Sequence, residues 1–449
     1  MQQRTISTTA SPLMVLPWAR IESLLCVVLF VTCLYYVYVS WLAPVYYYLG
    51  FTLSPGGHAV LWLSVAIVLV SASMMPLRLD AFSDYFLWMV FYFVYVPSMT
   101  FVPLQGTLAD DGFGLVCALG ASFNIMRFLA RYSVRLPGVR VSQNALIGTF
   151  ACIYFALTAY TLSVYGVNLR ISNLASLYEQ RTVSGELATG TLVGYATGFL
   201  SGAFNPFLMA YGLVRRRPVW FFIGAAGQLF VYSASALKSV ALTLVLLPIF
   251  YFFLIRRRHV TATRFGLLIL GSCLVPLLAL LLLDMADEGL AVQVVALVFM
   301  RTYGLAGALT GVYADFFASH PHTAFSHVSI VSTFVPYPYE QSLGQEVGYW
   351  LVSSPVDANA NFWATDGIAS AGNLGVILVG FIVGAFLVLA NGIIDRTSRR
   401  LAFTALIPFI MMACNTSIFT SMLTGGGGLM LMMIYLWQSQ TPQRGNGAS

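Results

Sequence analysis

The chain has 449 residues, of which 59% are hydrophobic and only 8% are charged. Soluble proteins carry about 25% charged residues, so this composition excludes a soluble globular protein and indicates a polytopic membrane protein. The formal net charge of +6 does not indicate nucleic-acid binding. The arginines gather in short blocks between apolar runs, which is typical of cytoplasmic anchoring loops.

Twelve apolar runs follow along the chain, each long enough to cross a bilayer at about 1.5 Å per residue. They lie near residues 21–40, 58–76, 85–104, 112–130, 144–165, 190–213, 219–235, 239–255, 265–284, 373–394, 401–420 and 424–438. The sequence therefore predicts an all-α polytopic membrane protein with about 12 transmembrane helices. The glycine run 425–428 lacks the Lys-Ser/Thr of a phosphate loop and is predicted to permit close helix packing.

The basic residues orient this arrangement, because 18 of the 22 lie in loops on one side of it. By the positive-inside rule that side is the cytoplasm, so both termini are expected there. Residues 1–284 would hold helices 1–9 with an outer loop at 166–189. Residues 285–372 would form a large outer loop, and residues 373–449 would hold helices 10–12 and a cytoplasmic tail.

An apolar segment, 289–317, lies inside the predicted outer loop. If it crossed the membrane, every later arginine block would face outward, which the positive-inside rule disfavours. We therefore expect a helix that lies at the outer interface or dips into it.

Four cations remain on the outer side: Arg170, Arg181, Lys238 and Arg301. A charge costs about 2.5–3.5 kcal/mol at the centre of a membrane helix and less near an interface, so these four need a compensating role. Together they would suit a lipid-linked phosphate or pyrophosphate. Each cation also has a purely structural explanation. Any of them could pair with an acid on the outer side, Arg181 could stabilise the C-terminus of a helix, and Lys238 could extend from a helix end towards water.

One residue of the long polar stretch 284–373 is a candidate for proton transfer. Histidine has an unperturbed pKa of about 6.5, so His327 is a candidate general base. A histidine hydrogen-bonded within a loop is the simpler alternative. The stretch contains no HExxH or EF-hand pattern, so neither a metal nor another cofactor is predicted.

Aromatic residues and amides lie close together in the second half of the same stretch. Tyr337, Tyr339 and Trp363 accompany Asn359 and Asn361. Flat aromatic faces beside amides suit a sugar, whose C–H faces stack on rings while its hydroxyls take the polar groups. A packed loop core is the alternative.

Seven segments, in this order and with this placement in loops, resemble the Wzy-type O-antigen polymerases of Gram-negative bacteria, an oligosaccharide repeat-unit polymerase family. They are Ser176–Arg181, Asn205–Gly212, Ala236–Val240, Thr310–Phe317, Phe325–His327, Asn359–Gly367 and Asn415–Thr420. They span about residues 170–430. A paired Arg-Gly loop motif proposed for some of these polymerases is absent, because Arg170 is followed eleven residues later by Arg181 rather than glycine.

The resemblance implies a GT-C-like membrane glycosyltransferase in the bacterial inner membrane, with the large loop in the periplasm. Its substrates would be undecaprenyl-pyrophosphate-linked oligosaccharides. The growing chain would move en bloc, with inversion and without a metal, onto the next lipid-linked unit. The four outer cations would then stabilise the pyrophosphate leaving group. The candidates for taking the proton of the acceptor hydroxyl would be His327, Asp315 and Asp366, in that order. The partners implied are this lipid-linked sugar, membrane lipid and a chain-length regulator protein.

Two alternatives stay open from the sequence. An O-antigen ligase or another lipid-linked sugar transferase would share the outer loop but use a different acceptor. A polysaccharide flippase or secondary transporter also fits twelve helices with both termini inside. Transporters usually place charge at mid-membrane and repeat one half in the other, whereas here the cations lie outside and no internal repeat is seen.

Overall fold

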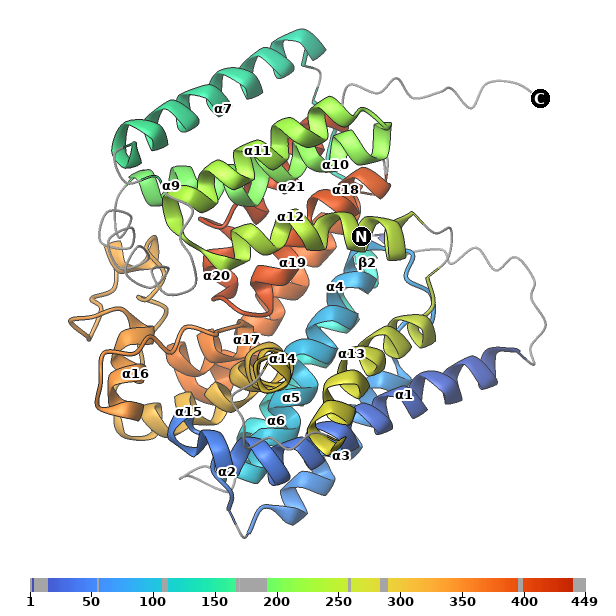
Figure 1. Ribbon diagram of the computed structural model, residues 1–449, viewed down its shortest axis with the longest axis vertical. Helices are drawn as coiled ribbons and strands as arrows, with labels where there is room; N and C mark the ends of the chain where they lie inside the picture. Colours follow the sequence, from blue (N-terminus) through green and yellow to red (C-terminus); the bar gives the residue numbers. More distant parts are fainter. Residues whose placement is uncertain are drawn as a thin grey trace. The chain divides into compact units, whose positions relative to one another are not determined.

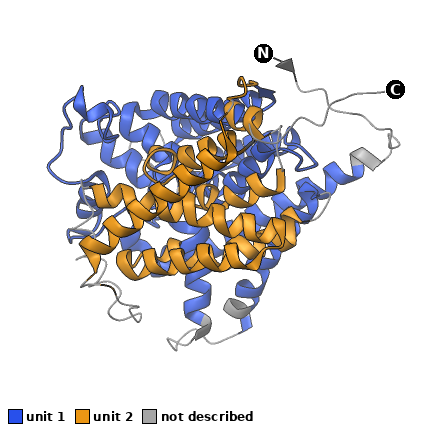
Figure 2. Cartoon of the chain, turned by 90° about the horizontal axis from the view of Figure 1, so that it is seen from above, with its two compact units in different colours: residues 1–133, 259–388, 413–418 blue, residues 134–258, 389–412, 419–449 orange. Residues whose placement is uncertain are grey.

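A computed structural model describes residues 2–3, 15–54, 56–106, 112–139, 141–166, 169, 192–256, 260–282, 290–394 and 399–438. The described residues are predominantly helical, as the sequence predicts (Figure 1). One short antiparallel pair joins β1 (Gln2–Gln3) to β2 (Tyr132–Ser133). The chain divides into two compact units that alternate along the sequence, coloured separately in Figure 2. Unit 1 comprises 1–133, 259–388 and 413–418, and unit 2 comprises 134–258, 389–412 and 419–449.

Unit 1 contains the following helices and short helical turns. They are α1 (Val15–Val37), η1 (Tyr38–Leu42), α2 (Ala43–Tyr46), η2 (Tyr47–Leu49), α3 (His58–Ser73), α4 (Phe82–Val90), η3 (Phe91–Tyr95), α5 (Val96–Gln105), α6 (Phe113–Leu129), α13 (Ala262–Leu282), α14 (Leu290–Val295), η6 (Ala296–Gly304), α15 (Leu305–Ser319), η7 (Val331–Thr333), α16 (Leu343–Val352) and α17 (Trp363–Ile394), whose residues from 389 on belong to unit 2.

The core of unit 1 is the continuous helix Phe82–Gln105, formed by α4, η3 and α5 and almost entirely buried. It packs against α15 at small residues, since a Cβ on Gly307 would lie 2.9 Å from the Phe101 ring. Hydroxyl and amide groups join the same pair of helices. Ser98 and Thr310 share a hydrogen bond of 3.0 Å, and Gln105 donates to the Ala308 carbonyl at 2.9 Å. Close approach through small residues and polar contacts is how membrane helices associate.

The helix α17 is broken near its start. Ala371 (φ −160°, ψ 35°) and Gly372 (φ 59°, ψ −141°) leave the helical region, and the positive φ of Gly372 favours glycine. The short half-helix 363–370 therefore folds back on the long one. Gly367 and Gly375 permit this close contact, since a Cβ on Gly375 would lie 2.0 Å from the Gly367 carbonyl oxygen. The long half-helix coincides with the predicted run 373–394.

Unit 2 is built from helices of both halves of the chain. They are α7 (Gln143–Tyr165), α9 (Leu192–Phe199), η4 (Leu200–Phe204), α10 (Asn205–Arg215), α11 (Pro218–Ser235), α12 (Lys238–Phe250), η5 (Tyr251–Ile255), α18 (Arg399–Ala405), α19 (Ile407–Ala413), α20 (Ile418–Met422) and α21 (Gly427–Gln438), with Ala413 and Ile418 assigned to unit 1.

The glycine run before α21 packs as predicted. A Cβ on Gly202, in the π-helical turn η4, would lie 1.8 Å from the Gly425 carbonyl oxygen, and one on Gly198 would lie 2.2 Å from the Thr424 carbonyl oxygen. Only glycine on α9 and η4 lets this backbone come so close. The predicted close packing at 425–428 is confirmed.

A break in the helix 192–215 leaves polar groups buried in unit 2. The Asn205 N–H bonds back to the Leu200 carbonyl in the π-helical register, and Pro206 has no N–H to continue it. Gln228 of α11 donates instead to the Ser201 carbonyl, at 3.3 Å. The side-chain amide of Asn205 is fully buried and has no hydrogen-bond partner among the described residues.

Seven helices in the described residues are long and apolar enough to cross a membrane, and three shorter apolar helices accompany them. The chain is therefore a multi-pass helical membrane protein. One of the seven is Val292–Ser319, formed by α14, η6 and α15. The sequence also predicts a helix in this segment, but one that lies at the outer interface or dips into it.

One predicted helix is wrong in its continuity. The run 401–420 is not a single helix but three short ones, α18, α19 and α20. A turn at 414–417 separates the last two, and its Ser417 is held by a side chain of unit 1 rather than by a helical neighbour. Pro408, which has no N–H, falls in the first turn of α19, where a helix tolerates it.

Candidate functional site

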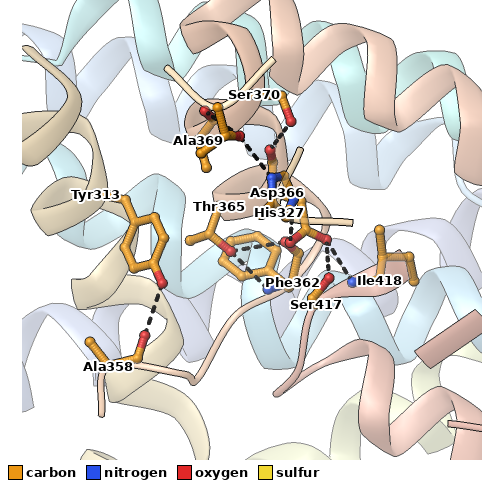
Figure 3. Close-up of polar contacts among 11 residues, drawn as sticks. Tyr313, His327, Ala358, Phe362, Thr365, Asp366, Ala369, Ser370, Ser417 and Ile418 are labelled. Atoms are coloured by element: carbon orange, nitrogen blue, oxygen red, sulfur yellow. Dashed lines mark hydrogen bonds and ion pairs between the residues drawn. The ribbon is translucent and has the colours of Figure 1, made fainter. Parts of the chain in front are cut away.

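The polar centre of unit 1 lies around Asp366, in the half-helix 363–370 of α17. Every residue from 361 to 370 is buried. His327 from the loop 320–342 and Ser417 from the turn 414–418 meet Asp366 of this half-helix, and Tyr313 of α15 bonds to Ala358 in the segment before it (Figure 3). Irregular backbone of this kind is tolerated in membrane proteins where it is enclosed by protein or lines a water-filled cavity.

The loop after α15 is held by the end of the half-helix, whose last carbonyls lack helical partners because α17 breaks at Ala371. Thr323 N–H donates to the Ala369 carbonyl at 2.8 Å, and Ala324 N–H donates to the Ser370 carbonyl at 3.1 Å. His322 Nδ1 lies 3.1 Å from the Ile368 carbonyl oxygen and must donate, since a carbonyl only accepts. These bonds fix the loop and bring the imidazole of His327 to Asp366.

His327 and Asp366 form a buried pair. The His327 Nε2 atom lies 3.7 Å from Asp366 Oδ1, and their side chains are 8% and 2% exposed. The other carboxylate oxygen, Oδ2, accepts hydrogen bonds from Ser417 Oγ at 3.0 Å and from the Ile418 N–H at 2.7 Å (Figure 3). Asp366 is thus held by the turn 414–418 on one side and faces His327 on the other.

The protonation state of His327 follows from its surroundings. Burial lowers its pKa to about 4, so the imidazole is neutral at pH 7. Its Nδ1 lies 2.8 Å from the Thr323 hydroxyl, which itself donates to the Ala369 carbonyl at 3.0 Å. Because the hydroxyl proton is used there, Nδ1 carries the imidazole proton and Nε2 presents a lone pair. A neutral imidazole whose second nitrogen can accept a proton, with a carboxylate near that nitrogen to attract the imidazolium formed, can act as a general base.

A second polar group surrounds Tyr313, a fully buried residue of α15. Its hydroxyl donates to the Ala358 carbonyl at 3.0 Å and also interacts with the side-chain amide of Asn361. The Asn361 Oδ1 atom and the Tyr337 hydroxyl are buried and have no hydrogen-bond partner among the described residues. Unsatisfied buried polar atoms of this kind call for an explanation, and a ligand is one.

The two tyrosines predicted to bind sugar lie together. The Tyr337 and Tyr339 rings meet edge to face at 5.6 Å, and the Tyr339 hydroxyl donates to the Pro321 carbonyl at 2.5 Å. Burial and the nearby Glu346 carboxylate raise the pKa of Tyr337 and raise the pKa of Tyr339 to about 12. Both phenols are therefore neutral hydrogen-bonding groups at pH 7.

The remaining sugar-site candidates have other surroundings. Trp363 is 2% exposed and its Nε1–H donates to the Ser122 hydroxyl at 3.0 Å, which is the position of a core residue. Asn359 is exposed and donates to Asp357 Oδ2 at 2.7 Å. Asp315 is half-buried on α15, two residues after Tyr313.

The structure describes two of the four predicted pyrophosphate-binding cations. Arg301 is exposed on η6 in unit 1, and Lys238 is exposed at the start of α12 in unit 2. Arg170 and Arg181 lie outside the described residues. Within the described part of the chain, no group of three or more His, Cys, Asp or Glu residues lies together as metal ligands would.

Three parts of this site are not predicted from the sequence: Tyr313, Thr323 and the turn at Ser417. Tyr313 and Ser417 lie inside segments that carry the family resemblance, which is the one signal pointing to them. Thr323 has no such signal, because its role depends on the half-helix carbonyl to which it donates.

Comparison of the chain with family models, curated proteins and solved structures finds no match in any of the three. The function must therefore be inferred from the site and from the motifs of the chain itself.

Proposed function

We propose that the protein is an O-antigen polymerase, a membrane glycosyltransferase that joins undecaprenyl-pyrophosphate-linked oligosaccharide repeat units at the periplasmic face. The observation that supports this most is the buried pair of a neutral His327 and a carboxylate, Asp366, 3.7 Å apart. A glycosyl transfer that inverts the anomeric carbon needs a base for the acceptor hydroxyl, and this pair supplies one.

In the proposed reaction, the acceptor sugar hydroxyl attacks the anomeric carbon of the growing chain. A new C–O bond forms there, the acceptor O–H proton passes to His327 Nε2, and the bond to the pyrophosphate oxygen breaks. The electron pair of that bond leaves with undecaprenyl pyrophosphate. Arg181, Lys238, Arg301 and Arg170 are the residues proposed to stabilise its charge without a metal.

Asp366 makes His327 competent as a base. Burial alone holds the His327 pKa at about 4, a penalty of about 3 kcal/mol against the unperturbed value. The Asp366 carboxylate 3.7 Å away acts against this penalty, because it attracts the imidazolium that forms when Nε2 takes up the acceptor proton. Asp315 is the proposed alternative partner in proton transfer.

Tyr337, Tyr339, Asn359 and Asn361 are the proposed sugar contacts. The two phenols are neutral and offer aromatic faces, and the two amides offer hydrogen bonds. We assign Trp363 a packing role next to the site rather than a sugar contact, because its indole N–H already donates to Ser122 in the core.

The proposal places the protein in the bacterial inner membrane with about 12 spans, a GT-C-like arrangement, cytoplasmic termini and residues 285–372 in the periplasm. The segment Val292–Ser319 then lies along the outer interface or dips into it, because a full crossing would turn the later arginine blocks outward. Membrane lipid and a chain-length regulator protein are the proposed partners.

The test is complementation of a strain that lacks the gene. Wild-type protein is expected to restore a ladder of polymerised O-antigen, whereas His327→Ala leaves lipopolysaccharide with a single repeat unit. His58→Ala is the matched control, because it removes an exposed imidazole at the start of α3, outside the loop that carries His327, and should leave the ladder intact. Membrane levels of each variant are measured alongside.

Two results would contradict the proposal. A normal ladder with His327→Ala would remove the proposed base. Loss of every repeat in the strain without the gene, including the single one, would indicate the alternative functions of ligase or flippase.

A further inference from the structure

The hydrogen bonds around Tyr313 fix the direction in which a neighbouring amide points. The Tyr313 hydroxyl has one proton, and it donates that proton to the Ala358 carbonyl at 3.0 Å. Its oxygen can therefore only accept from a second partner. That partner is the side-chain amide of Asn361, which must present Nδ2–H to the phenol.

This orientation leaves Asn361 Oδ1 as an acceptor turned away from Tyr313. Asn361 is 8% exposed, and its Oδ1 is buried with no hydrogen-bond partner among the described residues. A buried acceptor left unsatisfied costs about 1–3 kcal/mol. The amide is held in place by the chain from Asn361 to Tyr313 to Ala358, so it cannot relieve this cost by turning over.

The hydroxyl of Tyr337 is the second unsatisfied group. It is buried, it has no hydrogen-bond partner among the described residues, and it lies close enough to Tyr313 to act on it electrostatically. As a neutral phenol it can both donate and accept. Asn361 Oδ1 and the Tyr337 hydroxyl thus offer one fixed acceptor and one adaptable group.

The charges around these groups exclude an anion. Asp366 and Asp357 act on Tyr313, and Glu346 acts on Tyr337. Three acids and an amide oxygen would repel a phosphate, so the lipid pyrophosphate does not bind here. A neutral group that donates a hydrogen bond fits instead.

We propose that Asn361 Oδ1 and the Tyr337 hydroxyl form a subsite for a sugar group that donates a hydrogen bond, either a hydroxyl or an acetamido N–H. Tyr313 is its positioning residue, because it sets the amide orientation. The choice of a sugar as ligand rests on the proposed function. What the subsite adds is the direction of one bond: at Asn361 Oδ1 the ligand donates and the protein accepts.

The test measures thermal unfolding of the purified full-length protein in detergent with glucose, N-acetylglucosamine or inorganic phosphate. A ligand that binds the folded state at ten times its Kd stabilises it by about 1.4 kcal/mol, so the unfolding midpoint rises. We expect at least one sugar to raise the midpoint and phosphate to leave it unchanged. A shift with both sugars indicates a hydroxyl donor, and a shift with N-acetylglucosamine alone indicates the acetamido N–H.

Two variants make the assignment specific. Asn361→Leu keeps the approximate side-chain size but removes the acceptor, and it should abolish the sugar-dependent shift. Tyr313→Phe should reduce that shift several-fold, a readout that a purely structural role of the hydroxyl would not change. An unchanged sugar shift in Asn361→Leu, no shift with either sugar, or a shift with phosphate alone would overturn the subsite.

His327→Ala separates this inference from the proposed function. The variant should keep the sugar-dependent shift while losing the polymer ladder. A shift that depends on Asn361, combined with an intact His327→Ala ladder, would support the subsite and refute the proposed base. A sugar shift that persists in Asn361→Leu, combined with loss of the ladder in His327→Ala, would refute the subsite but not the proposed base.

Discussion

Replacing Asp366 by asparagine tests how the buried pair works, because the amide keeps the shape of the side chain but removes its charge. The Asn oxygen can still accept from Ser417 Oγ and the Ile418 N–H, which now bond to Asp366 at 3.0 and 2.7 Å. The amide nitrogen would face the Nε2 lone pair of His327, so the variant should fold. What it loses is the attraction between a carboxylate and an imidazolium at 3.7 Å.

That attraction is at most about 4.5 kcal/mol at an effective dielectric constant of about 20, since burial still holds the His327 pKa at about 4 with Asp366 in place. If His327 is the base, loss of the charge should slow chain extension by up to about 10³-fold. The assay is extension of lipid-linked repeat units by purified protein, with thermal unfolding as the check on folding. A rate for Asp366→Asn within tenfold of the wild type would refute the reasoning.

The remaining predictions concern stability. The pKa of His327 is about 4 when folded and about 6.5 when unfolded. The unfolded state thus binds more protons between these values, and about 3 kcal/mol of unfolding free energy is lost as the pH falls from 7 to 4. Denaturant titrations should show this slope, and His327→Gln should flatten it. Gly372→Ala should destabilise by about 1–3 kcal/mol, because φ is 59° there, and an unchanged unfolding midpoint would contradict this. Asn205→Leu should leave the midpoint unchanged or raise it, since the buried amide makes no hydrogen bond with the described residues, and a large fall would show that the amide has a partner.

The helices were predictable because apolar length is a local property of the chain. The predicted runs at 144–165 and 239–255 correspond closely to α7 and to α12 with η5. The packing role of the glycine run 425–428 was also predictable, since glycine is the one residue that lets two backbones touch. The interruption of the run 401–420 was not predictable, because it depends on hydrogen-bond partners outside the run, such as Asp366.

The candidate site was predictable in its members but not in its pairing. His327 and Asp366 stood out as an imidazole and a carboxylate in a polar stretch of an apolar chain. Their contact depends on the break at Ala371 and Gly372, which frees the carbonyls that hold the loop. The fold-back of the half-helix rests on the contact between Gly367 and Gly375, and hydrophobic periodicity carries no sign of it.

The most direct test of the central claim is an in vitro reaction. Purified protein in lipid nanodiscs is mixed with undecaprenyl-pyrophosphate-linked repeat units and a metal chelator. We predict that the wild-type protein forms products of two or more repeats and releases undecaprenyl pyrophosphate, and that His327→Ala does neither. No extended product from the wild-type protein, or equal extension by His327→Ala, would contradict it.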